Sequence, residues 1–222
     1  MNIWIAGSPE EVAQAAQTGL VNAVVTNPTV IADWTQSGEP LEAVVTSVIK
    51  ATNLPLYIQL HGPGRDQFLR EADYLKKISG QIIPKIPATL EGLAAAAVLE
   101  RQGIETLITT VCSLNQAYVA AVAGVTAICP YYSRLRDHGE DATRFIREVA
   151  DMYRREGVPT RIRPASVRNV EDVAQCLQSG ADGVIVFYDV FRQLTAHAVS
   201  DSSLANFEND WPRIKLSSGY PV

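Results

Sequence analysis

The sequence predicts an α/β fold, a (β/α)8 TIM barrel with an additional C-terminal helix. Short segments rich in β-branched residues alternate with longer helical patterns along the whole chain of 222 residues, and this alternation is typical of a sheet of parallel strands. Several helical patterns end at a glycine directly before the next strand, as at Gly103, Gly157 and Gly180. A glycine in that position closes the helix of an αβ turn.

The alternating segments form eight successive β-α units. We expect strands at residues 3–6, 23–27, 56–60, 82–86, 106–111, 127–131, 160–165 and 183–188, and helices at 9–18, 41–50, 67–78, 90–102, 114–123, 142–155 and 170–178. Eight units in a chain of this length match a barrel near its lower size limit. A doubly wound open sheet is the alternative, but no glycine-rich phosphate loop follows the first strand.

The chain is expected to form one barrel domain over residues 1–222. Within it, residues 200–211 are predicted to form the extra helix and residues 212–222 a flexible tail. The helix carries an apolar stripe of Leu204, Phe207 and Trp211. This stripe would pack either on its own barrel or on a neighbouring subunit.

Composition narrows the classes of function. Apolar residues make up 47% and charged residues 19% of the chain, so a large core is expected and disorder is not. The net charge of -5 gives no general attraction to nucleic acid or to an anionic membrane. The N-terminus lacks the basic region of a signal peptide, and three widely spaced cysteines without a CxxC pair indicate reduced thiols. We expect a cytoplasmic protein without a metal.

Lys85 lies in the segment Ile-Ile-Pro-Lys-Ile-Pro at 82–87, which offers no other charge. In the apolar interior of a barrel an ammonium group is disfavoured, so its pKa falls below the ordinary value of about 10.4. A partly neutral amine attacks carbonyl carbons and forms a Schiff base. The alternative is an exposed strand lysine whose stem lies on the sheet.

Catalytic groups of such barrels gather at the C-terminal ends of the strands. Polar residues occur at these ends in most of the predicted strands: Thr26 and Asn27, Gln59 and His61, Lys85, Thr109, Tyr131 and Arg134, and Ser166. Each has a simpler explanation, such as a turn former for Asn27, a surface charge for Arg134 or a helix N-cap for Ser166. Their joint position at one rim favours a site.

Four segments together resemble the transaldolase family, and more closely its short subfamily of fructose-6-phosphate aldolases and small transaldolases. They are Thr-Asn-Pro-Thr at 26–29, Pro-Lys-Ile-Pro-Ala-Thr-Leu-Glu-Gly-Leu at 84–93, Pro-Tyr-Tyr-Ser-Arg at 130–134 and Ala-Ser at 165–166. The resemblance implies a class I aldolase without cofactor or metal, with Lys85 as the Schiff-base lysine. It also implies a ring-shaped homo-oligomer, a pentamer or decamer.

The resemblance assigns roles to further residues. Asn27, with Thr26 beside it, matches the position that binds the dihydroxyacetone unit, and Thr109 matches the threonine that holds the catalytic water. Arg134 and Ser166 match the pair that binds the substrate phosphate, which suits the forked donors of arginine. The aldolases have glutamine on strand three and tyrosine on strand six, as Gln59 and Tyr131 do here, whereas transaldolases have glutamate and phenylalanine.

One position departs from the family pattern. The first strand of the family ends with an aspartate that points into the site, and Ala6 stands here instead. A lost acid–base group costs about 10²–10⁴-fold in rate unless another group replaces it. His61 is a candidate replacement because it titrates near neutrality, although a histidine in the following loop is the simpler interpretation.

We therefore expect an aldolase that joins dihydroxyacetone or a similar ketone to an aldehyde such as glyceraldehyde 3-phosphate. The alternatives are a transaldolase, which passes the same three-carbon unit between sugar phosphates, and a catalytically impaired homologue that only binds sugar phosphates. The expected partners are these small molecules, with neither nucleic acid nor membrane among them.

Overall fold

The computed structural model describes residues 1–216 and 220, and residues 217–219 and 221–222 lie outside the described part. The chain forms two compact units, Met1–Phe191 and Arg192–Val222, which are treated separately below. The predicted barrel lies in the first unit. The predicted C-terminal helix lies in the second.

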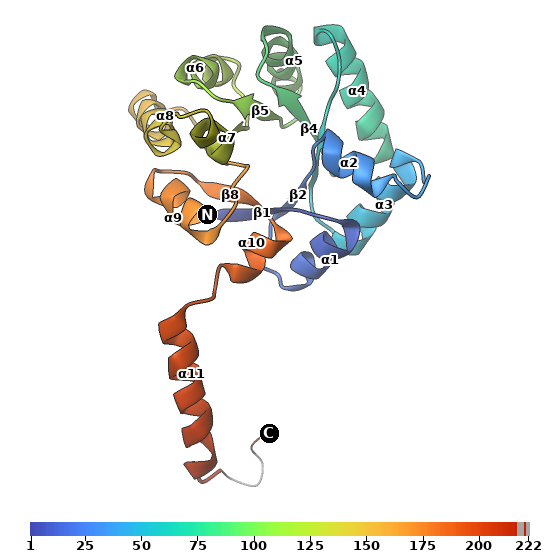
Figure 1. The fold of residues 1–222 in the computed structure, drawn as a ribbon. Coiled ribbons are helices and arrows are strands. Elements are labelled where there is room, and N and C mark those ends of the chain that lie inside the picture. Colours follow the sequence, from blue (N-terminus) through green and yellow to red (C-terminus); the bar gives the residue numbers. More distant parts are fainter. Residues whose placement is uncertain (217–219, 221–222) are drawn as a thin grey trace. The chain divides into compact units, whose positions relative to one another are not determined.

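Eight parallel strands form the centre of the first unit (Figure 1), in the order β7-β6-β5-β4-β3-β2-β1-β8. The strands are β1 (Asn2–Ala6), β2 (Ala23–Val25), β3 (Leu56–Gln59), β4 (Ile82–Pro87), β5 (Leu107–Val111), β6 (Ala127–Pro130), β7 (Arg161–Ile162) and β8 (Gly183–Phe187). Backbone bonds from Asp182 N to Ile162 O at 3.0 Å and from Ile185 N to Pro164 O at 2.8 Å join β8 to the β7 segment. The ring is therefore closed, which confirms the barrel and rejects the open sheet.

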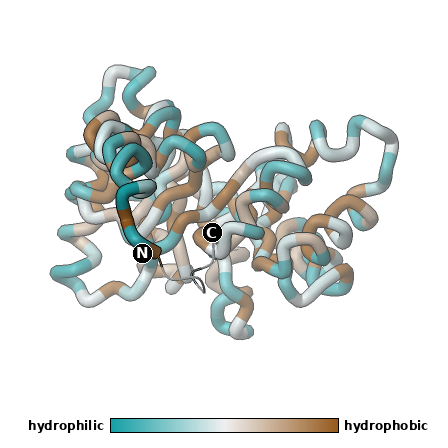
Figure 2. Tube along the Cα trace, turned by 90° about the horizontal axis from the view of Figure 1, so that it is seen from below, coloured by the Kyte–Doolittle hydropathy of each residue, from teal (hydrophilic) through white to brown (hydrophobic). Residues whose placement is uncertain are grey.

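Helices surround the ring; those that precede β8 connect successive strands, and one short helix follows β8. They are α1 (Pro9–Gln17), α2 (Pro28–Trp34), α3 (Leu41–Thr52), α4 (Arg65–Ile78), α5 (Leu90–Arg101), α6 (Leu114–Val122), α7 (Tyr132–Asp137), α8 (Ala142–Glu156), α9 (Val170–Gln178) and α10 (Tyr188–Gln193). Hydrophobic and hydrophilic residues alternate along these helices (Figure 2), as expected where one face covers a sheet.

Local sequence explains where these helices begin and end. Ser8 and Glu11 form a reciprocal capping box at the start of α1, and the Thr89 hydroxyl caps α5 by accepting from Gly92 N at 3.0 Å. The predicted C-terminal glycines Gly103, Gly157 and Gly180 all have positive φ angles, between 66° and 99°. None of the helices in the described part is both long and apolar enough to cross a membrane.

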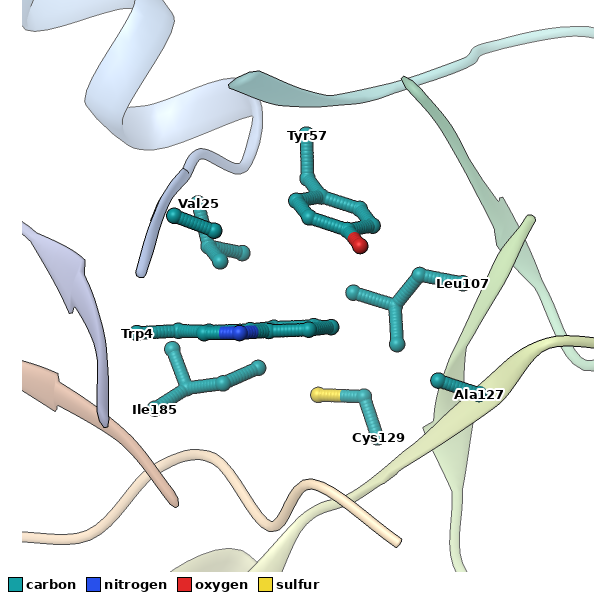
Figure 3. Close-up of a cluster of buried hydrophobic side chains, with 8 residues drawn as sticks. Trp4, Val25, Tyr57, Leu107, Ala127, Cys129 and Ile185 are labelled. Atoms are coloured by element: carbon teal, nitrogen blue, oxygen red, sulfur yellow. The ribbon is translucent and has the colours of Figure 1, made fainter. Parts of the chain in front are cut away.

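Inward-facing side chains fill the barrel (Figure 3). Trp4 stacks on Tyr57 with ring centroids 4.4 Å apart. The Arg163 guanidinium lies over the Trp4 ring, 5.2 Å from its centroid. Around them lie Val25, Leu107, Ala127, Cys129 and Ile185, all buried. This layer of side chains, called the hydrophobic floor below, lies beneath the C-terminal ends of the strands.

The second unit contains the predicted extra helix. It is α11 (Ala198–Asp210), followed by a short 3-10 turn, η1 (Trp211–Arg213). No residue of α11 is buried, and Val199, Leu204 and Phe207 are exposed. Of the flexible tail predicted at 212–222, residues 217–219 and 221–222 lie outside the described part.

Three short helices were not predicted. Helices α2, α7 and α10 follow β2, β6 and β8 with few residues between, and each is too short to show an apolar repeat. Strand β7 is also shorter than predicted, since only Arg161 and Ile162 pair with β6. Ala165, further along, returns to the sheet through an isolated bridge with Tyr131, and Pro164 between them has no N–H to give to a ladder.

Candidate active site

The predicted site residues form the next layer above the hydrophobic floor. Because side chains alternate along a strand, the residue two positions after each floor residue also points inward. From Trp4, Val25, Tyr57, Leu107 and Cys129 this step leads to Ala6, Asn27, Gln59, Thr109 and Tyr131. From Ile83, which packs against the floor, it leads to Lys85. The alternation of the strands thus carries the predicted residues into one layer.

Lys85 is buried, with 4% of its surface exposed. Its Nζ donates a hydrogen bond to the backbone carbonyl oxygen of Thr26, 2.8 Å away. Burial lowers the pKa of the Lys85 amine, an effect that the Cys129 thiol opposes and the nearby positive charge of Arg134 reinforces. The alternative of an exposed strand lysine is therefore wrong. This amine is held in place and is easier to deprotonate than an ordinary lysine.

A cavity of about 300 Å³ opens over Lys85 at the C-terminal ends of the strands. The predicted site residues that line it are Ala6, Thr26, Asn27, Lys85, Tyr131, Arg134 and Ser166. Deeper pockets with more apolar walls are usual for drug-like ligands, whereas this one has polar groups on several sides. Its size and lining suit a small, hydroxyl-rich molecule.

Tyr131 stands between the floor and the cavity. Its hydroxyl accepts a hydrogen bond from Thr109 Oγ1 at 3.3 Å, and the Arg134 guanidinium lies over its ring at 4.6 Å from the centroid. Burial raises the pKa of Tyr131, which the Thr109 bond partly offsets. The phenol therefore stays protonated at neutral pH and is available as a hydrogen-bond donor.

Asn27 serves two purposes. Its Oδ1 accepts from Val30 N at 3.0 Å and so caps α2, which confirms its turn-forming interpretation. The same side chain lines the cavity, and its amide NH₂ group adds donors there. The neighbouring Thr26 hydroxyl donates to Tyr57 O at 2.9 Å, so Thr26 presents its backbone rather than a free hydroxyl to Lys85.

Two residues near the site have left-handed backbone conformations. Ser166 has φ 59° and Thr110, which follows Thr109, has φ 62°. Non-glycine residues adopt this region at a cost and often at functional sites. Ser166 does not cap α9, because Asn169 does so by accepting from Asp172 N at 2.8 Å. The positive φ of Ser166 instead accompanies a turn of the chain at the cavity, and that of Thr110 accompanies a shift in the pairing of β5 with β6 between Ile108 and Val111.

Gln59 and His61 differ in their surroundings. Gln59 pairs in register with Lys85 on the next strand, and its buried Oε1 has no hydrogen-bond partner among the described residues. His61 is exposed and does not line the cavity; its backbone N–H donates to Glu71 Oε2 at 2.6 Å. Strand β3 ends at Gln59, so the alternation that predicted an inward His61 does not continue to that residue.

Several cavity residues were not predicted. Thr29, Val30 and Asp33 enter from α2, and Phe187 from the end of β8. The signal for α2 was present, since Asn27-Pro28 is an N-cap followed by proline at the first helical position. A helix beginning at Pro28 places Thr29 and Asp33 on one face.

Cys129 is another residue that the sequence did not single out. It is completely buried in the floor, next to the Lys85 amine and hydrogen-bonded to the Thr109 side chain. Burial raises the pKa of the thiol, so it remains uncharged. Among the described residues no group of three or more histidine, cysteine or acidic side chains is arranged to hold a metal ion.

Known proteins resemble this chain in sequence and in fold. The sequence model of the family described as transaldolase/fructose-6-phosphate aldolase matches residues 6–216. A probable transaldolase 1 of Listeria monocytogenes is 36% identical over 206 residues, covering 93% of this chain and 95% of that protein. A probable transaldolase of Caulobacter vibrioides is 36% identical over 200 residues, covering 90% and 91%.

The similarity to solved structures concerns the fold alone. A crystal structure of 3-hexulose-6-phosphate synthase aligns with a TM-score of 0.62 at 13% identity, over 87% of this chain and 98% of the other.

A barrel with a buried lysine at its mouth and a family match over nearly the whole chain define an aldolase-type enzyme. The chain belongs to the transaldolase/fructose-6-phosphate aldolase family.

Proposed function

We propose that the protein is a Schiff-base aldolase that reversibly joins dihydroxyacetone, or a similar small ketone, to an aldehyde such as glyceraldehyde 3-phosphate. The observation that carries this proposal is the Lys85 amine, buried and bonded to Thr26 O at 2.8 Å beneath a small polar cavity. A nucleophile of this kind needs a lowered pKa and a fixed position, and burial provides the first.

In the synthetic direction the neutral Lys85 amine attacks the ketone carbonyl. The carbinolamine loses water and becomes a protonated iminium, which withdraws electrons from the adjacent carbon. That carbon loses a proton to give an enamine, and the enamine attacks the aldehyde to form the carbon–carbon bond, while the aldehyde oxygen takes up a proton. Water then adds to the new iminium and releases the product, restoring the amine.

Three neighbours suit the proton transfers of this cycle. The protonated Tyr131 hydroxyl, bonded to Thr109 at 3.3 Å, can give a proton to the developing alkoxide, directly or through water, and take it back in cleavage. Gln59 has a buried oxygen without a partner beside Lys85. A water or substrate hydroxyl would satisfy that oxygen, and Gln59 and Thr109 together would orient the water that enters and leaves.

Arg134 and Ser166 would bind the substrate phosphate. Both line the cavity, and a guanidinium offers two parallel donors to phosphate oxygens. The stacking of Arg134 on the Tyr131 ring would hold its donors in place. A phosphorylated aldehyde would thus lie with its charged end on the side of β6 and β7.

A transaldolase is the second candidate, and the relatives named as probable transaldolases favour it. It uses the same lysine but transfers the three-carbon unit instead of releasing it. Gln59 and Tyr131, which match the aldolase pattern, favour release. Incubation with fructose 6-phosphate, with and without erythrose 4-phosphate, separates the two: an aldolase releases dihydroxyacetone in both mixtures, and a transaldolase forms sedoheptulose 7-phosphate only with the acceptor.

The Schiff base is tested by reductive trapping. The protein is incubated with dihydroxyacetone or with fructose 6-phosphate, reduced with borohydride, digested and analysed by mass spectrometry. We expect a three-carbon adduct on Lys85 and none on the exposed Lys77 or in Lys85→Met. A folded protein that takes no adduct from either compound would contradict the aldolase and the transaldolase alike, and would favour a homologue that only binds sugar phosphates.

A further inference from the structure

The cavity above Lys85 has oppositely charged walls. Arg134 enters from α7, directly after β6, and Asp33 enters from α2, directly after β2. In the closed ring of eight strands β2 and β6 are four strands apart, so they lie across the barrel from each other. The guanidinium and the carboxylate therefore face the same cavity from opposite sides, with Lys85 on β4 between them.

Asp33 is the one carboxylic acid among the described residues that line this cavity. The first strand, which ends in Ala6, offers none there. The Oδ1 atom of Asp33 accepts a hydrogen bond from Gln36 Nε2 at 3.0 Å, and no group in the described part of the chain bonds to its Oδ2 atom. One carboxylate oxygen is thus open to a bound molecule.

Helix α2 is fixed at both ends. The Asn27 side chain caps its first turn. The indole Nε1 of Trp34, the residue after Asp33, donates to Gly7 O at 2.9 Å in a buried contact. This bond ties the end of α2 to the segment directly after Ala6. Thr29, four residues before Asp33, lines the same cavity and adds a hydroxyl to this wall.

We propose that Asp33 is a specificity-determining residue that selects a ketone donor with an uncharged, hydroxyl-bearing end and rejects a phosphorylated one. The inference rests on the proposed Schiff base at Lys85. A substrate attached there through its carbonyl carbon, with its phosphate at Arg134, must direct its other end toward the wall of Asn27, Thr29 and Asp33. A carboxylate accepts hydrogen bonds from hydroxyl groups and repels a phosphate.

The test compares the trapping of two donors on Lys85, dihydroxyacetone and dihydroxyacetone phosphate, in the wild type and in Asp33→Asn. The amide keeps the shape and an acceptor oxygen but removes the charge. We expect the trapping rate with dihydroxyacetone to change by less than about threefold and the rate with the phosphate to rise about tenfold, the factor that roughly 1.4 kcal/mol represents. Asp73→Asn, an exposed acid on α4 outside the cavity, makes the same change in net charge and should match the wild type.

Salt provides a second measurement that a purely structural role would not change. Repulsion at an exposed carboxylate is screened, so rising ionic strength should bring the donor preference of the wild type closer to that of Asp33→Asn, because the attraction of the phosphate to Arg134 is screened equally in both proteins. Equal donor ratios in the wild type and Asp33→Asn, with normal trapping of dihydroxyacetone, would overturn the role of Asp33 alone. A wild type that traps neither donor would overturn the Schiff base and this inference with it.

Discussion

At the scale of single residues, the environment of Lys85 favours the neutral form of its amine. Among the described residues the amine has one hydrogen-bond partner, a neutral carbonyl, rather than a carboxylate that would hold it charged. Its nearest ionisable neighbour in the floor, Cys129, has a raised pKa and stays neutral. Burial is therefore the largest effect on the amine, and the opposing effect of the Cys129 thiol does not cancel it.

Replacing Lys85 by methionine should stabilise the fold near neutral pH while abolishing the adduct. Burial lowers the pKa of Lys85 in the folded protein, whereas the unfolded chain has the ordinary value of about 10.4. Between these two values the unfolded chain binds more protons, so wild-type stability rises with pH across that window. The advantage of Lys85→Met in free energy of unfolding should be largest below the folded pKa and shrink toward about pH 10.

Urea titrations of both proteins at several pH values measure this difference. Lys77→Met is the matched control, because Lys77 is an exposed lysine on α4. A difference between wild type and Lys85→Met that stays constant with pH would mean that the buried amine carries no penalty for its charge.

The proposed role of the Tyr131 hydroxyl in proton transfer is tested by removing that hydroxyl. Tyr131→Phe keeps the ring under Arg134 but removes the group bonded to Thr109. We expect kcat for fructose 6-phosphate cleavage to fall by about 10²–10⁴-fold with little change in KM. Tyr118→Phe, at an exposed position on α6, should be as active as the wild type. A rise in KM with unchanged kcat would assign Tyr131 to binding alone.

At the scale of elements, the sequence predicted most of what the structure contains, for physical reasons. Long helices that cover a sheet need an apolar face and a closing glycine, and both are visible in single-sequence patterns. Helices α2, α7 and α10 were not predicted, because a helix of six or seven residues is too short to show a complete apolar repeat. The strand ends that carry Lys85 and Tyr131 were predicted. The contribution of α2 to the cavity was missed, although Asn27-Pro28 marks the start of that helix in the sequence.

The junction of β4 and α5 shows how closely two elements pack beside the proposed Schiff-base lysine. A Cβ on Gly92 would lie 2.2 Å from Pro87 O and 3.0 Å from Ile86 Cγ2, so only glycine lets the first turn of α5 approach β4. Because β4 carries Lys85, any shift of this strand moves the amine relative to Thr26 O.

Gly92→Ala is therefore expected to destabilise the protein by about 1–3 kcal/mol and to slow the trapping of dihydroxyacetone. Thermal unfolding and the trapping rate measure the two effects. Gly80→Ala is the control, since a Cβ there meets nothing within 4 Å. If Gly92→Ala unfolds like the wild type and traps dihydroxyacetone at the same rate, the close approach of α5 to β4 affects neither stability nor the reactivity of Lys85.

At the scale of the whole molecule, the apolar residues of the second unit lead to a prediction about assembly. Helix α11 exposes Val199, Leu204 and Phe207, a costly arrangement for a helix that stays in water. The resemblance that identified the site also implies a homo-oligomer. We expect the protein to associate through this helix.

Light scattering after size exclusion tests that expectation. Replacing Leu204 and Phe207 together by serine should lower the mass toward that of one chain, 24.1 kDa. Glu208→Gln, an exposed change on the same helix, should leave the mass of the assembly unaltered. A wild type that already runs as a single chain would contradict the expectation.

The ring closure described above also divides the chemistry between the two halves of the chain. Asn27, Asp33 and Lys85 come from the first four strands and their connections, and Tyr131, Arg134 and Ser166 come from the last four. In terms of the proposed roles, the first half would carry the Schiff-base amine without the phosphate-binding groups, and the second half would carry those groups without the amine. A protein made of either half alone would therefore lack part of the proposed site.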